Sequence, residues 1–403
     1  MENKRDVTKK DVTTYGFSVN KFVLSVLGQW PYQTKIQKLI IRIIGNTIMS
    51  LANLTSLIAL YDVRNDFDAV IERVPMFMTG VFYFINFFTL VSQSTKLKTL
   101  LDDIKNSFRA IKRNSEEEEQ ILIQSAKEGN LVLFCYIFLM ASFTVLYCLA
   151  TLTPVALDLI MPLNESRTTN FIYDVNYVFL EKEDHYYFIF CHSTIAGVYC
   201  IGTVMSFDMM LYLFAKHVNA MFRVLRHRLK NLVERSDINQ NFAKEDYKSM
   251  EKGTISCIKL YNDIIVFTNN VESCFATCLT FTMGVSAVIM CFQGVMIVVR
   301  IDQPDQVIMF ATYFMSQAIH LFFDCFSGEM LVTASGSVSN YIYNTNWYVM
   351  PQKQKKLLLM MMLRSINDCH VTIGKFLILN NETYSKLMKT VFSYLSVLMS
   401  VRE

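Results

Sequence analysis

Seven long apolar stretches constrain the fold of this chain more than any other feature. A helix that crosses the hydrocarbon core of a bilayer needs about 20 mostly apolar residues. Of the 403 residues, 52% are hydrophobic and only 18% are charged, a balance unlike that of an ordinary soluble domain. The sequence therefore predicts an all-α polytopic membrane protein with seven transmembrane helices, at residues 39–60, 74–92, 130–153, 186–215, 265–299, 307–334 and 383–401.

The distribution of basic residues predicts how this bundle sits in the membrane. Lys and Arg are enriched in connections on the cytosolic side. The N-terminal arm with Arg42 and the connections 93–129, 216–264 and 335–382 hold 30 of the 38 basic residues, whereas the opposite connections hold 6. This asymmetry predicts a cytosolic N-terminus and, with seven spans, an extracellular C-terminus.

The segments outside the spans complete the expected organisation. We expect a cytosolic arm with an interfacial helix at 1–38, six spans within 39–334 with cytosolic helical extensions at 216–264, a small helical cytosolic anchor at 335–382, and the seventh helix at 383–403. The run "RNSEEEEQ" from Arg113 to Gln120 is predicted to be a charged surface turn. The sequon Asn164-Glu165-Ser166 lies in a predicted outer loop, where Asn164 would be glycosylated.

The sequence contains no motif for catalysis or cofactor binding. We find no Gly-rich phosphate loop, no Cys-x-x-Cys pair, no His-Glu-x-x-His and no Gly-x-Ser-x-Gly. The sequence thus predicts no enzyme, no cofactor and no metal site. Carboxylates within a membrane are costly and need partners. We expect inner Lys and Arg residues to pair with the four that lie in or near the spans, Asp208, Glu272, Asp324 and Glu329.

The last predicted span, "MKTVFSYLSVLMSV" from Met388 to Val401, has two unlike faces. At 100° per residue, Thr390, Ser393, Val397, Ser400 and Val401 share one small or hydroxylated face, and the bulky apolar residues share the other. Small and hydroxyl residues allow close packing between transmembrane helices. They also suit a water-filled pore in which valines form a hydrophobic gate, which requires several subunits. Both interpretations fit the residues.

Four segments resemble the insect odorant receptors, a family of odorant-gated cation channels with seven spans. "LGQWP" from Leu27 to Pro31 is similar to a short family motif before the first span. "FFDCFSGEMLVTASGSVSNYIYNTNWY" from Phe322 to Tyr348 is similar to the family's most recognisable stretch. "KKLLLMMMLRS" from Lys355 and "TYSKLMKTVFSYLSVLMSV" from Thr383 resemble the two halves of its last helix.

The resemblance implies a ligand-gated, non-selective cation channel in the plasma membrane of olfactory sensory neurons. Family members form tetramers with a common co-receptor, which carries a long insertion between spans four and five. This chain has no such insertion, so it resembles the ligand-tuned subunit of a heterotetramer. The resemblance also favours a pore-lining role for Thr390, Ser393 and Ser400, with Val397 and Val401 as gate residues.

The resemblance further implies a pocket for a small volatile apolar ligand in the outer halves of spans two, three, four and six. The positions of this chain that match are Phe82, Tyr83, Val145, Leu149, His192, Ile195, Ala196, Tyr199, Tyr313, Ser316 and Gln317. Aromatic walls with a few polar groups suit such a ligand.

Three other classes of membrane protein fit the sequence less well. A gustatory receptor-type channel is disfavoured because no Gln-Phe follows Thr383-Tyr384. A G-protein-coupled receptor would have the opposite orientation and an Asp-Arg-Tyr after its third span. A secondary transporter would show inverted repeats, which are not visible here.

Overall fold

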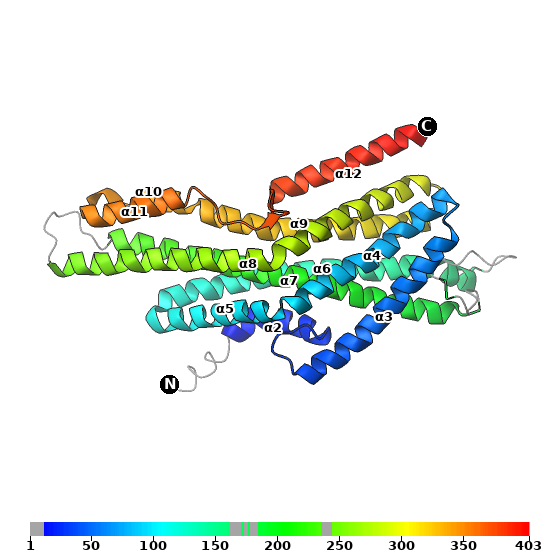
Figure 1. The fold of residues 1–403 in the computed structure, drawn as a ribbon, viewed down its shortest axis with the longest axis horizontal. Helices are drawn as coiled ribbons and strands as arrows, with labels where there is room; N and C mark the ends of the chain where they lie inside the picture. The colour runs from blue at the N-terminus through cyan, green and yellow to red at the C-terminus, as the bar shows by residue number, and fades with distance from the viewer. Residues whose placement is uncertain (1–11, 162–170, 173–175, 178–183, 235–243, 403) are drawn as a thin grey trace.

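The computed structural model describes residues 12–161, 171–172, 176–177, 184–234 and 244–402, and these residues form an elongated, almost entirely helical molecule (Figure 1). Its elements are α2 (Val12–Val26), α3 (Lys35–Asp62), α4 (Phe67–Ser92), α5 (Ser94–Asn114), α6 (Glu116–Ile160), α7 (Tyr186–Glu234), α8 (Lys244–Val299), α9 (Pro304–Gly336), α10 (Val338–Tyr343), the 3-10 turn η1 (Trp347–Val349), α11 (Gln352–Arg364), β1 (Thr372–Ile373), β2 (Leu377–Ile378) and α12 (Asn381–Arg402).

Within the described part of the chain, six helices are long and apolar enough to cross a membrane: α3, α4, α6, α7, α8 and α9. The first six predicted spans lie in these helices. The seventh predicted span forms α12, which is helical but is not among the six, because Lys386, Lys389 and its hydroxyl residues make it less apolar. The chain is thus an all-α multi-pass membrane protein with one amphipathic terminal helix.

Several helices extend far beyond the membrane thickness. The 49 residues of α7 correspond to roughly 74 Å at about 1.5 Å per residue, whereas the hydrocarbon core is about 30 Å thick. The helix α7 continues through residue 234 and α8 begins at residue 244, so described residues of the predicted extension at 216–264 are helical. Together α7 and α8 form the long axis of the molecule (Figure 1).

The acidic run near Arg113 is not the surface turn predicted from its charge. It forms the first turn of α6, because Ser115 caps the helix by accepting a hydrogen bond from the Glu118 backbone N–H at 3.3 Å. Acidic residues are favourable at a helix N-terminus, where unpaired N–H groups carry partial positive charge. Glu118 also accepts two hydrogen bonds from Arg228 of α7, at 2.7 and 2.8 Å.

The motif "LGQWP" ends α2 and turns the chain toward α3. Gly28 has φ of +67°, a left-handed conformation that favours glycine, and Trp30 and Gln29 are buried. A Cβ on Gly28 would lie 3.0 Å from Cβ of Ile41, so the turn also packs tightly against α3.

A short hairpin, which the sequence did not predict, joins α11 to α12. Strands β1 and β2 pair antiparallel and are joined by the three residues 374–376, of which Gly374 and Lys375 have positive φ, a conformation common in tight hairpin turns. The Gly374 N–H donates to Thr280 Oγ1 of α8 at 2.6 Å. The hairpin therefore fixes the start of α12 against the bundle.

Candidate ligand cavity and terminal helix

A cavity lies among α4, α6, α7 and α9. Small-molecule pockets have mainly apolar walls with a few polar groups. The walls are formed by Met76, Thr79 and Phe82 of α4; Met140, Phe143, Thr144, Tyr147 and Cys148 of α6; Ser193, Thr194, Gly197, Val198, Cys200, Ile201 and Val204 of α7; Thr312, Tyr313, Ser316, Gln317 and His320 of α9; and Ile172. These are the helices that contain spans two, three, four and six.

Four of the ligand-binding residues expected from the sequence line this cavity: Phe82, Tyr313, Ser316 and Gln317. The Tyr313 hydroxyl is hydrogen-bonded to Thr79 Oγ1 of α4. The Ser316 hydroxyl donates to the Tyr313 carbonyl at 2.8 Å. Gln317 is buried, and its side-chain oxygen has no hydrogen-bond partner in the described residues. Of these polar groups, Gln317 therefore retains an unused hydrogen-bonding atom.

Three expected residues lie in a neighbouring aromatic cluster instead. Tyr83, Ala196 and Tyr199 pack between α3, α4 and α7. The Tyr83 and Tyr199 ring centroids are 5.9 Å apart, and the Tyr83 hydroxyl donates to Asn46 at 3.0 Å. Gly45 of α3 permits this packing, since a Cβ there would overlap the Tyr199 ring.

The remaining four expected residues also lie outside the cavity lining. Val145, Leu149 and Ile195 are exposed on the outside of the chain. Each successive residue of a helix is rotated by about 100°, so Thr144, Tyr147 and Cys148 face the cavity while Val145 and Leu149 do not. His192 contacts the Tyr177 hydroxyl through Nδ1 at 2.6 Å.

The residues of α6 that line the cavity were not among those expected from the sequence. Tyr147 packs edge-on against Tyr313, with ring centroids 6.3 Å apart. Thr144, Tyr147 and Cys148 have the spacing of one helix face, and they are more polar than the aliphatic residues around them. This more polar face is the feature of the sequence from which the cavity-facing side of α6 could have been predicted.

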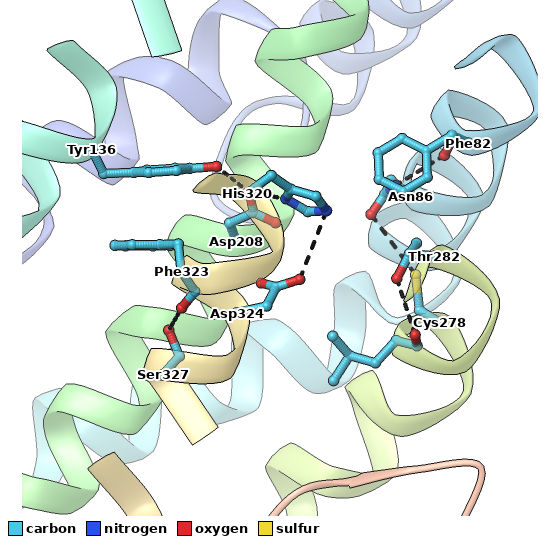
Figure 2. Close-up of polar contacts among 11 residues, drawn as sticks. Phe82, Asn86, Tyr136, Asp208, Cys278, Thr282, His320, Phe323, Asp324 and Ser327 are labelled. Carbon is cyan, nitrogen blue, oxygen red and sulfur yellow. Dashed lines mark hydrogen bonds and ion pairs between the residues drawn. The ribbon is translucent and has the colours of Figure 1, made fainter. Parts of the chain in front are cut away.

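Figure 2 shows a buried polar cluster around His320. His320 also lines the cavity, so the cluster borders it. His320 Nδ1 is 2.8 Å from Asp208 Oδ2, and the Tyr136 hydroxyl donates to the same oxygen. His320 Nε2 is 3.9 Å from Asp324 Oδ2. The Tyr136 ring stacks on Phe323 with centroids 3.9 Å apart, which holds the hydroxyl toward Asp208.

The predicted pairing of the four carboxylates with inner Lys and Arg residues is wrong. Asp208 and Asp324 surround His320, and Glu272 accepts a hydrogen bond from Thr372 at 2.7 Å. Glu329 accepts hydrogen bonds from the Thr333 hydroxyl and the Asn381 backbone N–H. Neutral groups and one imidazole thus take the place of the expected cations, because helix packing brings them closer than the basic residues at the helix ends.

The terminal helix α12 lies on the outside of α8 and α9 (Figure 1). Part of its apolar side packs inward, since Val391 is 1% exposed and Leu395 fits against Gly294 of α8, whereas Phe392 of the same side is 53% exposed. Its other side points outward, with Val397 58% exposed.

The exposed hydroxyls of α12 are satisfied within their own helix. Thr390, Ser393 and Ser396 donate to the carbonyls four residues earlier at 2.8 to 2.9 Å, and Ser400 donates to the Val397 carbonyl at 2.8 Å. Lys386 forms an ion pair with Glu382 at 2.7 Å. Val401 belongs to α12, but its side chain, like all of Asn164, lies outside the described residues.

Comparison with known proteins gives one consistent result. A family model described as 7tm Odorant receptor matches residues 66–392. Odorant receptor 9a of Drosophila melanogaster is 23% identical over 208 residues, which are 52% of this chain and 50% of that protein. Odorant receptor 13a of the same species is 21% identical over 279 residues, covering 65% of this chain and 64% of that protein. The chain spans between half and two thirds of the length of these curated relatives.

The fold matches a solved structure over nearly its whole length. The insect olfactory receptor OR5 from Machilis hrabei in complex with eugenol superimposes with a TM-score of 0.78 at 13% sequence identity. The match covers 96% of this chain and 97% of that chain. At this level of identity, the similarity describes the fold.

Proposed function

The chain belongs to the 7tm Odorant receptor family, and on that basis we propose that it is a ligand-gated, non-selective cation channel subunit tuned to a small apolar odorant. The observation that carries the proposal is the cavity among α4, α6, α7 and α9, enclosed mainly by aromatic and aliphatic side chains. Membership in this family favours a channel over a gustatory-type receptor, a G-protein-coupled receptor and a transporter.

The odorant would be held by shape and by one polar contact. Phe82, Tyr147 and Tyr313 provide apolar walls, and Gln317 has an unused hydrogen-bonding atom. A buried polar atom without a partner gains from a ligand that supplies one. The geometry therefore fits a largely hydrocarbon molecule with a single hydrogen-bonding group.

The helix α9 connects this cavity to the terminal helix. Tyr313 lines the cavity, and the next residue, Phe314, lies against Phe392 of α12 with ring centroids 6.2 Å apart. Further along α9, Phe322 packs edge-on against Tyr384 of α12 at 5.5 Å. A ligand that moves α9 would therefore move α12, and the state with the higher ligand affinity would be favoured.

In the channel, α12 would cross the membrane and line a central pore. The N-terminus would be cytosolic, and α12 helices from this subunit and a common co-receptor would surround the pore in a heterotetramer. Thr390, Ser393 and Ser400 would line it, and Val397 and Val401 would close it by dewetting. The outward hydroxyls of α12 and the inward packing of Val391 and Leu395 support this arrangement. The assembly would operate in the plasma membrane of olfactory sensory neurons.

The proposal is tested by current recording in cells that express this chain with and without the co-receptor, across a panel of odorants. We expect at least one odorant to evoke a cation current when both proteins are present. Gln317→Leu should raise the half-effective concentration about 3- to 10-fold, the effect of one lost hydrogen bond. Leu149→Ala is the matched control, since Leu149 faces away from the cavity. Silence across the panel despite surface expression would contradict the proposal.

A further inference from the structure

The hydrogen bond between Tyr313 and Thr79 can run in only one direction. Thr79 Oγ1 lies 2.7 Å from the Pro75 carbonyl oxygen, one turn earlier in α4. Two oxygens at this distance need a hydrogen between them, and a carbonyl has none, so the single hydroxyl hydrogen of Thr79 points to Pro75. Thr79 can then only accept a hydrogen bond from Tyr313. The Tyr313 hydrogen is therefore used inside the protein and is not available to a ligand.

The direction of this bond decides how the Gln317 amide is turned. Gln317 lies one helical turn beyond Tyr313 on α9, and its side chain interacts with the Tyr313 hydroxyl. Because the Tyr313 hydrogen is used, the Tyr313 oxygen can only accept, so the Gln317 amide turns its N–H donors toward Tyr313 and its carbonyl oxygen away. Gln317 Oε1 is the atom that has no hydrogen-bond partner in the described residues. The open end of this hydrogen-bond chain is therefore an acceptor.

Most other hydroxyls of the cavity wall also use their hydrogens within the protein. His320 turns its ring nitrogens toward Asp208 and Asp324 (Figure 2). No hydrogen bond to the described part of the chain fixes the hydroxyls of Ser193 and Thr312, which can turn to donate or to accept. Four hydroxyls donate to backbone carbonyl oxygens at 2.8 to 3.2 Å: Thr144 to Met140, Tyr147 to Ile172, Thr194 to Phe190 and Ser316 to Tyr313.

We propose that Thr79 makes the cavity select ligands that carry an O–H donor, alcohols and phenols, over carbonyl compounds of the same skeleton. This selectivity rests on the proposed function, because it requires that the cavity binds the odorant. A ligand hydroxyl donates to Gln317 Oε1, an atom that is costly to leave unpaired. A ligand carbonyl would place a second acceptor against that oxygen with no hydrogen between them. Thr79 acts through Tyr313 and Gln317, so it is a positioning residue.

Replacing Thr79 should reverse the direction of the chain. Thr79→Val removes the acceptor of the Tyr313 hydrogen, which can then turn toward Gln317 Oε1. The Gln317 amide would in turn present its N–H donors to the ligand. Carbonyl compounds gain a donor in this variant, whereas alcohols lose their acceptor. Thr79→Ser keeps a hydroxyl that can donate to the Pro75 carbonyl, so it should keep the selectivity of the unmodified chain.

The test measures ligand binding to the purified full-length chain in lipid nanodiscs with three matched pairs: octanol and octanal, benzyl alcohol and benzaldehyde, and phenylethanol and acetophenone. We expect the alcohol of each pair to bind more tightly to the unmodified chain. In Thr79→Val, the ratio of the two dissociation constants should shift toward the carbonyl compound by about 3- to 10-fold, the effect of one hydrogen bond. The ratio cancels any loss of folded protein, because that loss weakens both ligands equally.

Thr89→Val is the matched control for the valine substitution. The Thr89 hydroxyl donates to the Ile85 carbonyl of the same helix at 2.8 Å, but Thr89 is not among the residues that line the cavity. The ratio of dissociation constants should stay unchanged in Thr89→Val and in Thr79→Ser.

Three results would overturn the proposal: equal or tighter binding of the carbonyl compounds to the unmodified chain, an unchanged ratio in Thr79→Val, or no binding by any of the alcohols. The channel function fails by a different result, the absence of any odorant-evoked current, since binding to the purified chain needs no current.

Discussion

The neighbouring helices α9 and α12 both carry polar side chains at helical spacing, but they use them in opposite ways. In α9, Tyr313 bonds to Thr79 of α4, and His320 bonds to Asp208 of α7. In α12, the hydroxyls of Thr390, Ser393 and Ser396 bond only to carbonyls of their own helix. Tyr313 and His320 thus link α9 to its neighbouring helices, whereas these hydroxyls of α12 leave a satisfied, outward face. A face of that kind suits water or another subunit.

Replacing a tightly packed glycine of the bundle by alanine should change the stability of the protein more than the other substitutions below. A Cβ on Gly328 of α9 would lie 2.1 Å from the Leu379 carbonyl oxygen, which is backbone and cannot rotate away. A Cβ on Gly294 of α8 would meet only the flexible end of Leu395 of α12. We expect Gly328→Ala to destabilise the protein by about 1 to 3 kcal/mol and Gly294→Ala by less. Thermal unfolding of the purified variants measures the difference, and equal effects would show that α12 packs as rigidly as the hairpin.

A double-mutant cycle should give a coupling energy of intermediate size for α9 and none for α12. Tyr313→Phe and Thr79→Val remove the two ends of one hydrogen bond between α9 and α4, so we expect a coupling energy of about 1 kcal/mol in the ligand-free protein. Ser393→Ala combined with Thr79→Val should show no coupling, because the Ser393 hydroxyl bonds within α12. A coupling near zero for the first pair would remove the contrast between the helices.

Removing the ion pair at the start of α12 should have the smallest effect on the stability of the protein. The hydrogen bond from Lys386 lowers the pKa of the exposed Glu382 carboxyl, and the positive charge of Lys386 adds to this. A lowered folded-state pKa stabilises the protein above the unfolded value of about 4.3 and loses that contribution as the pH falls through the folded value. Glu382→Gln should therefore lower the melting temperature slightly at neutral pH and not at acidic pH. High salt should reduce the difference, since the pair is exposed.

Much of this fold could be predicted because membrane spans leave a strong signal in the sequence. Six apolar runs mark the cores of α3, α4, α6, α7, α8 and α9, since a bilayer requires that length and composition. The local details carried weaker signals. The four glutamates of the first turn of α6 predict a solvated surface turn, because their charge gives no indication of the helix that follows. The hairpin before α12 depends on positive φ at Lys375, a conformation that its residue type does not indicate.

The candidate sites were less predictable because they depend on helix phase and on contacts between distant residues. Val145 and Thr144 are adjacent in the sequence, yet only Thr144 faces the cavity. The spacing of His320 and Asp324 was visible on one helix face, but Asp208 lies 112 residues before His320. No local pattern connects these positions, so only the packing of α7 against α9 brings the three side chains together.

We propose that a ligand in the cavity opens a pore lined by the outward face of α12. Val397→Cys reports on this opening when it is expressed with the co-receptor and treated with a charged thiol reagent with and without odorant. The chain without the substitution is the control, since Cys135 and Cys191 are also exposed. We predict that the reagent alters the odorant-evoked current of Val397→Cys rapidly when odorant is present and slowly when it is absent. A current that the reagent leaves unchanged in both conditions would contradict the account.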